Sequence, residues 1–144
     1  MARAGGKDKQ WAQAEFIAAD LGDKRRTGRL VELAQRLSER PEMSLPQALE
    51  HTAALKAAYR FFDNAAIAHE SVLAPHVLSS IGRMRSRPVV LAVQDTSYLD
   101  YATHPATAAL GPLNATGGHG MILHTTLAVT PERLPLGVLS LRLW

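Results

Sequence analysis

The sequence predicts an α+β protein, in which a helical N-terminal part is followed by a part made of strands. Five segments before residue 85 have the apolar spacing or end signals of helices, and three short runs after it have the composition or alternation of strands. With 47% hydrophobic and 20% charged residues, the composition is that of a globular protein. We expect a flexible leader over residues 1–10, a helical domain over 11–84 and a second domain over 85–144.

The clearest helix is predicted between Asp23, a suitable N-cap, and Pro41, which ends it. Its apolar residues follow the i, i+3, i+4, i+7 pattern of an amphipathic helix. They are Leu30, Leu33, Ala34 and Leu37. A shorter helix is expected before it, over residues 11–22. A third should begin at Ser44, because Gln47 completes the pattern of a capping box.

Two further helices are predicted before the composition changes. In residues 55–64, helical spacing places Leu55, Tyr59 and Phe62 on one face. Residues 69–84 form the last helix, with a bend expected at Pro75.

Three antiparallel strands are predicted in the second domain. The run "VVLAVQ", residues 89–94, is rich in β-branched residues and indicates a strand that is buried on both faces and ends at Asp95. Residues 121–129 and 134–144 form the second and third strands, and in the third, polar residues alternate with leucines. Three strands leave apolar faces that need cover, which suggests a chain cut short.

Composition excludes several classes of function. The chain has no cysteine, which rules out disulfides, zinc–thiolate sites and thiol chemistry. It has no apolar run of about 18 residues and no apolar signal segment, so we expect a cytoplasmic protein without a membrane partner. The six histidines lack the spacing of known metal motifs.

Positive charge is concentrated near the N-terminus. Residues 1–40 hold nine Lys and Arg against six Asp and Glu, whereas residues 41–82 hold two against four. Four of these cations crowd the first turns of the helix after Asp23, where the helix dipole disfavours them. Helix N–H groups and arginines together can bind a phosphate, and the alternative is a solvated basic face. The four are Lys24, Arg25, Arg26 and Arg29.

Arg60 is a further candidate for nucleic-acid binding. It lies among aromatic residues in "AYRFF", where its guanidinium could bind a phosphate or stack on a base. The alternative is that its aliphatic stem packs on the core.

Asp95 raises the question of metal binding, because a strand end is a common place for a carboxylate ligand. Two-metal phosphoryl chemistry needs several acidic ligands. Asp100 would have to fold back to share a metal with Asp95, and Glu132 is expected at the far end of the sheet. These residues alone leave two interpretations open, a metal ligand and a turn residue that ends the strand.

Three separated segments resemble one family. They are "WAQAEFIAADLGDKRRTGRL", "AYRFFDN" and "VQDTSYLDY…GPLNATGGHGMILHTTLAV". In this order and spacing they resemble the N-terminal part of Tn5-like (IS4-group) DDE transposases, from about Trp11 to Trp144.

The resemblance implies a double-stranded DNA partner, the terminal repeats of a transposon, and a catalytic domain that is RNase H-like. Asp95 matches the first aspartate of the Asp-Asp-Glu triad, which holds Mg²⁺ or Mn²⁺ for DNA cleavage and strand transfer. Arg25, Arg26 and Arg29 match the DNA-contacting basic motif, and Arg60 matches the arginine of a Tyr-Arg-Phe motif.

The resemblance also implies what this chain lacks. The second Asp and the Glu of the triad would lie beyond residue 144, so we expect a truncated transposase that binds transposon ends without strand transfer, located at the bacterial nucleoid. The alternatives are a stand-alone DNA-binding module, an inhibitor of the intact transposase, which would then be a partner, and a non-functional remnant.

Overall fold

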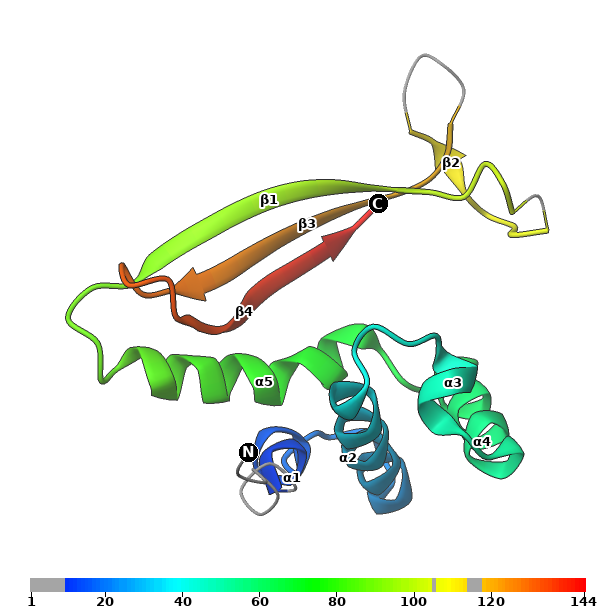
Figure 1. Ribbon diagram of the computed structural model, residues 1–144, viewed down its shortest axis with the longest axis horizontal. Coiled ribbons are helices and arrows are strands. Elements are labelled where there is room, and N and C mark those ends of the chain that lie inside the picture. The colour runs from blue at the N-terminus through cyan, green and yellow to red at the C-terminus, as the bar shows by residue number, and fades with distance from the viewer. Residues whose placement is uncertain (1–9, 105, 114–117) are drawn as a thin grey trace, which may run out of the picture. The chain divides into compact units, whose positions relative to one another are not determined.

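The computed structural model of the chain describes residues 10–104, 106–113 and 118–144 (Figure 1). Of the predicted leader over residues 1–10, all but Gln10 lies outside the described residues. The observed class is α+β, with five helices followed by an antiparallel sheet, as the sequence predicts.

The chain divides into two compact units, Met1–His76 and Val77–Trp144. The sequence places the change at residues 84–85, at the end of the last helix, whereas the structure divides inside that helix. The reason is that the last turns of the helix bond to the sheet: Nε of Arg83 donates a hydrogen bond to the carbonyl oxygen of Leu136 over 2.5 Å. The two units are called the helical unit and the sheet unit below.

All five predicted helices are present, but the first ends at Phe16 and not at residue 22 as predicted, and the cap signals of the second and third are confirmed. Asp23 caps the second, since its Oδ1 accepts the backbone N–H of Arg25 at 2.8 Å. At the third, Oε1 of Gln47 accepts the N–H of Ser44 at 3.1 Å. In the described part of the chain, no helix is long and apolar enough to cross a membrane. The helices are α1 Trp11–Phe16, α2 Lys24–Glu39, α3 Leu45–Leu49, α4 Thr52–Phe62 and α5 His69–Met84.

The helical unit packs around the apolar stripe of α2. Leu30 and Leu33 are buried as predicted, and Leu49 of α3 has no exposed surface. The remaining core residues are Ala19, Leu21, Ala58 and Phe61.

The predicted face of α4 is only partly correct. Leu55 packs against the core, but Tyr59 and Phe62 are 47% and 56% exposed, and Ala58 and Phe61 are buried in their place. Spacings of three and of four residues both fit a helix, so a run with several aromatics does not by itself reveal which of them turn inward. Two aromatic side chains of α4 therefore face solvent.

The sheet unit contains the three predicted strands and one short additional strand. β3 is central and antiparallel to its neighbours, with β1 on one side and β4 on the other (Figure 1). The short strand β2 pairs with the first residues of β3. The strands are β1 Leu91–Asp100, β2 Gly111–Pro112, β3 His119–Val129 and β4 Pro135–Leu143.

The first strand differs from its prediction in length and burial. It continues to Asp100 instead of ending before Asp95, and most of its side chains are exposed, so the prediction of a strand buried on both faces is wrong. Residues 95–100 contain Thr, Ser and Tyr, which fit a strand as well as a turn. Pairing with β3 holds this polar segment extended, and that pairing is not visible in the local sequence.

Candidate nucleic-acid interface

The start of α2 is fixed to the segment before it. Oγ1 of Thr27 donates a buried hydrogen bond to the carbonyl oxygen of Ala19 at 3.0 Å. Nη1 of Arg26 donates another to the carbonyl oxygen of Leu21, also at 3.0 Å. Gly22 makes the turn between them with φ +73°, in the left-handed region that favours glycine. These contacts hold the basic first turn of α2 in a defined place.

Lys24 and Arg25 are the exposed cations of this turn, which contains no acidic side chain. Lys24 forms no ion pair with any residue that the structure describes. Arg25 is 91% exposed and pairs with Asp23 at 3.0 Å. Hydrogen bonds from Arg25 lower the pKa of Asp23, and the hydrogen bond to Asp23 raises the pKa of Arg25. An exposed pair of this kind is weak, so Arg25 can exchange its carboxylate for a phosphate.

Arg26 and Arg29 are more strongly occupied. Arg26 is half-buried and closes the turn onto Leu21. Arg29 pairs with Glu32 at 2.5 Å, and Glu32 also pairs with Arg36 at 3.2 Å. Two arginines thus share one carboxylate, which leaves this part of the helix with net positive charge. Their first role is structural, and their charge adds to the field at the helix start.

Arg60 lies on a different helix from the other four cations, in the last turn of α4. It is exposed, and within the described residues it has no ion-pair or hydrogen-bond partner. The neighbouring Tyr59 and Phe62 are exposed as well. A cation also stabilises the C-terminal end of a helix, but the two exposed aromatics have no such structural role. Together the three side chains present a charged group and two stacking surfaces.

The pairing of Arg25 with Asp23 leads to a first prediction. Asn caps a helix as well as Asp does, so Asp23→Asn should keep α2 intact and release Arg25. We expect DNA affinity at low salt to rise about twofold to fivefold, the range set by exposed ion pairs. Fluorescence anisotropy with a labelled duplex would measure it.

Asp20→Asn provides the matched control, because it removes a nearby negative charge without touching Arg25. Oδ1 of Asp20 accepts the N–H of Gly22 at 3.2 Å, and an asparagine can keep this bond. Equal effects of the two substitutions would contradict a specific role for Arg25.

The cap at Asp23 also makes the stability of α2 depend on pH. Since the pKa of Asp23 is lowered, the stabilisation by its carboxylate is fully present above the ordinary Asp pKa and is lost as the pH falls through the lowered value.

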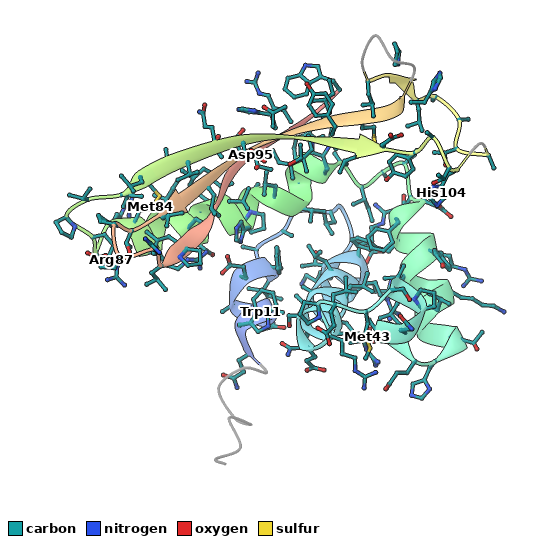
Figure 2. All side chains as sticks on the ribbon, turned by 45° about the horizontal axis from the view of Figure 1, so that its top comes forward. Trp11, Met43, Met84, Arg87, Asp95 and His104 are labelled. Carbon is teal, nitrogen blue, oxygen red and sulfur yellow. The ribbon has the colours of Figure 1, made fainter. Side chains whose placement is uncertain are left out.

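Asp95 lies within β1 and not at its end (Figure 2). It is exposed, it stands opposite Thr125 of β3, and its Oδ2 accepts a hydrogen bond from Oγ of Ser97 at 2.9 Å. The interpretation of Asp95 as a strand terminator is therefore wrong. Its carboxylate remains accessible to a cation.

Asp95 has no second acidic ligand beside it in the described structure. Asp100 lies five positions along the same strand, and side chains alternate between faces, so the two carboxylates point to opposite sides of the sheet. His119 and His124 are separated in the same way on β3. Within residues 10–104, 106–113 and 118–144, no three His, Asp or Glu side chains are placed to hold a metal ion. One carboxylate with a neighbouring hydroxyl fits Mg²⁺ only as a part of its ligand set.

One group of residues was missed by the sequence interpretation. Thr96 and His124 come together across β1 and β3, with Oγ1 and Nδ1 2.7 Å apart. Arg142 of β4 stands opposite His124 in the strand register, and the ring of Trp144 lies 6.3 Å from the His124 ring, centroid to centroid. The alternation of polar residues with leucines in the last strand was the available signal, but it does not show which residues of other strands join them.

Comparison with known families supports nucleic-acid binding by the helical unit. Residues 8–67 match the family model described as transposase DNA-binding. The matched range contains α1 to α4 and all five candidate cations, and ends before Asp95 and the sheet. The first part of this chain is therefore similar to the DNA-binding N-terminal region of transposases, which supports DNA as its partner and a role in DNA binding during transposition.

Proposed function

We propose that this chain is the N-terminal portion of a Tn5-like DDE transposase and that its helical unit binds the terminal repeats of the transposon. The observation that supports this most is the match of residues 8–67 to transposase DNA-binding, combined with exposed cations inside that range. The phosphate contacts are assigned to Lys24, Arg25 and Arg60. Arg26 holds the basic turn through Leu21, and Arg29, paired with Glu32, adds to the positive field of α2.

The charge arrangement at α2 favours phosphate over an internal structural role. Cations in the first turn of a helix repel its positive dipole end, and the one acidic group at this helix end is the N-cap Asp23, which pairs with Arg25 and not with Lys24. Asp23 already accepts the N–H groups of Arg25, Arg26 and Thr27, so a phosphate here would be bound by the exposed side chains of Lys24 and Arg25. A structural role requires partners, and Lys24 and Arg60 have none within the part of the chain that the structure describes.

Salt dependence provides the test, because each phosphate contact releases counterions. The log–log slope of affinity against salt should fall by about 0.9 for each contact that is removed. For Lys24→Ala/Arg60→Ala we expect a slope that is lower by about 2 and an affinity about 10- to 100-fold weaker near 0.1 M salt. Anisotropy titrations with a duplex at several salt concentrations would measure both.

Arg36→Ala/Arg40→Ala is the matched control. It removes the same charge, but both side chains are paired with carboxylates, Arg36 with Glu32 and Arg40 with Glu50. We expect less than a threefold loss and little change in slope. If the control weakens binding as much as the test variant does, the assignment of specific phosphate contacts fails.

The catalytic part of the proposal concerns Asp95. The arrangement of β1, β3 and β4 as consecutive antiparallel strands is compatible with the start of an RNase H-like sheet. Asp95 would supply one ligand of a Mg²⁺ or Mn²⁺ ion that activates the nucleophile in phosphodiester cleavage. Its role differs from that of the cations, so Asp95→Ala should leave duplex affinity within about twofold in the titration described above.

A second candidate function is DNA binding without cleavage, either alone or in competition with intact transposase. The separation of Asp95 and Asp100 on opposite faces of one strand favours it, since two-metal chemistry needs acidic groups around one site. The duplex-binding surface is the same in both cases.

A further inference from the structure

One face of the sheet is polar across all three long strands. Side chains of residues paired across strands share a face, so the register defines two rows that run across β1, β3 and β4. The first row consists of Gln94, Thr126 and Ser140, and the second of Thr96, His124 and Arg142. All of them except Thr96, which bonds to His124, line a shallow hollow of about 360 Å³ together with Trp144.

A third row on this face is aromatic at both ends. Tyr98 pairs with Ile122, and Ile122 exchanges backbone hydrogen bonds with Trp144, each at 3.1 Å. Tyr98 is 61% exposed and Trp144 64% exposed, so both rings are open to a ligand. Neighbouring strands are about 4.8 Å apart, which puts the two rings on either side of Ile122 about 10 Å from each other.

An arginine supplies positive charge in the second row of this face. Arg142 has no carboxylate partner within the described residues. The ring of His124 is held through Nδ1 by Thr96, which leaves Nε2 for another partner. Among the described residues of this face, Asp100 is the one acid, and it lies at the end of β1, four positions from Thr96, where its Oδ1 accepts the N–H of Ala102 at 2.8 Å.

From this arrangement we propose that the polar face binds a single nucleic-acid strand, with a phosphate at Arg142 and His124 and a base on Trp144. Successive residues on one face of a strand are about 6.8 Å apart, close to the spacing of phosphates along a nucleic-acid strand. Stacking on aromatic side chains beside basic groups is how sheets bind unpaired nucleotides. A duplex would not present its bases in this way. The proposal relies on the proposed function for its partner, DNA, but concerns a different surface and a different form of DNA.

The test uses the full chain carrying Trp11→Phe and Lys24→Ala/Arg60→Ala. In this background Trp144 is the only tryptophan, and duplex binding by the helical unit is weakened. Titration with a short oligothymidylate should quench the Trp144 emission with saturation. Arg142→Ala should weaken the binding at least about tenfold, as expected for loss of a phosphate contact.

Arg85→Ala is the matched control, because Arg85 is an exposed arginine of the same unit outside this face. Equal effects of Arg142→Ala and Arg85→Ala, or the absence of saturable quenching, would overturn the proposal. The proposal would also be overturned if a duplex quenched the Trp144 emission as strongly as the single strand does. Equal quenching by inorganic phosphate at the same concentration would overturn it as well. Anisotropy of a labelled oligonucleotide with Trp144→Ala, in otherwise native sequence, gives a second measurement that does not depend on Trp11→Phe.

The two proposals can fail separately. If Lys24→Ala/Arg60→Ala leaves duplex binding unchanged while Arg142→Ala abolishes the quenching, the proposed function loses its phosphate contacts and the polar face stands. If Lys24→Ala/Arg60→Ala weakens duplex binding while Arg142→Ala leaves the quenching unchanged, the helical unit is the DNA-binding surface and single-strand binding by the polar face is contradicted.

Discussion

Leu49→Ala should unfold the helical unit at a temperature well below that of the unchanged protein. Leu49 has no exposed surface and lies in the core with Leu30, Leu33 and Phe61. Removing three carbon atoms there loses transfer free energy and leaves a cavity, at a cost of about 2–5 kcal/mol. A small domain has a stability of similar size, so the unit would be largely unfolded under mild conditions.

Thermal unfolding followed by far-UV circular dichroism and by Trp11 fluorescence would measure the loss. Trp11 reports on the helical unit, because its Nε1 donates a hydrogen bond to Oγ of Ser38 at 3.1 Å. Ile17→Ala is the control, since Ile17 belongs to the helical unit, is 54% exposed and also loses three carbon atoms, so the change there should cost little. An equal effect of both substitutions would show that the core is not where the structure places it. Duplex binding should decrease along with the folded fraction.

Gly120→Ala should disrupt the sheet unit and leave the helical unit folded. A Cβ atom at position 120 would lie 1.9 Å from the carbonyl oxygen of Leu99 on β1 and 2.9 Å from Cδ1 of Leu113. The side chain of Leu113 can move, but the carbonyl oxygen belongs to the strand paired with β3. Separating the strands here should cost about 3 kcal/mol or more.

The strand partner of Gly120 provides the control. Gly111 of β2 faces Gly120 in the register, and a Cβ added at position 111 meets nothing within 4 Å. Gly111→Ala should therefore leave the stability of the sheet nearly unchanged. Denaturant unfolding followed through Trp144, with Trp11 replaced by Phe, would separate the two variants. A Gly120→Ala protein as stable as Gly111→Ala would contradict the close approach of β1 and β3.

The helical unit could be predicted from sequence to a large extent, because its signals are local. The stripe of α2, the cap at Asp23 and the capping box at Ser44 each lie within a few residues of one another. The inward face of α4 could not be predicted, since the choice between Phe61 and Phe62 depends on what the rest of the core leaves free.

The candidate sites show the same limit. The sequence identified the cations of α2, but it did not separate Lys24 and Arg25, which are available, from Arg26 and Arg29, which are engaged by Leu21 and Glu32. Partner choice depends on geometry that short motifs do not fix. The polar face of the sheet joins residues almost fifty positions apart, so a sequence window could not reveal it.

The position of Asp95 along β1 has a consequence for solution behaviour. Within the described chain, β1 bonds to β3 alone, so its other side carries open backbone donors and acceptors that a strand from another molecule could meet. A carboxylate halfway along such an edge opposes this self-association through charge repulsion and hydration. Substituting Asp95 would thus favour oligomers as well as remove the proposed metal ligand. Variants at this position have to be compared at low protein concentration, where the two effects separate.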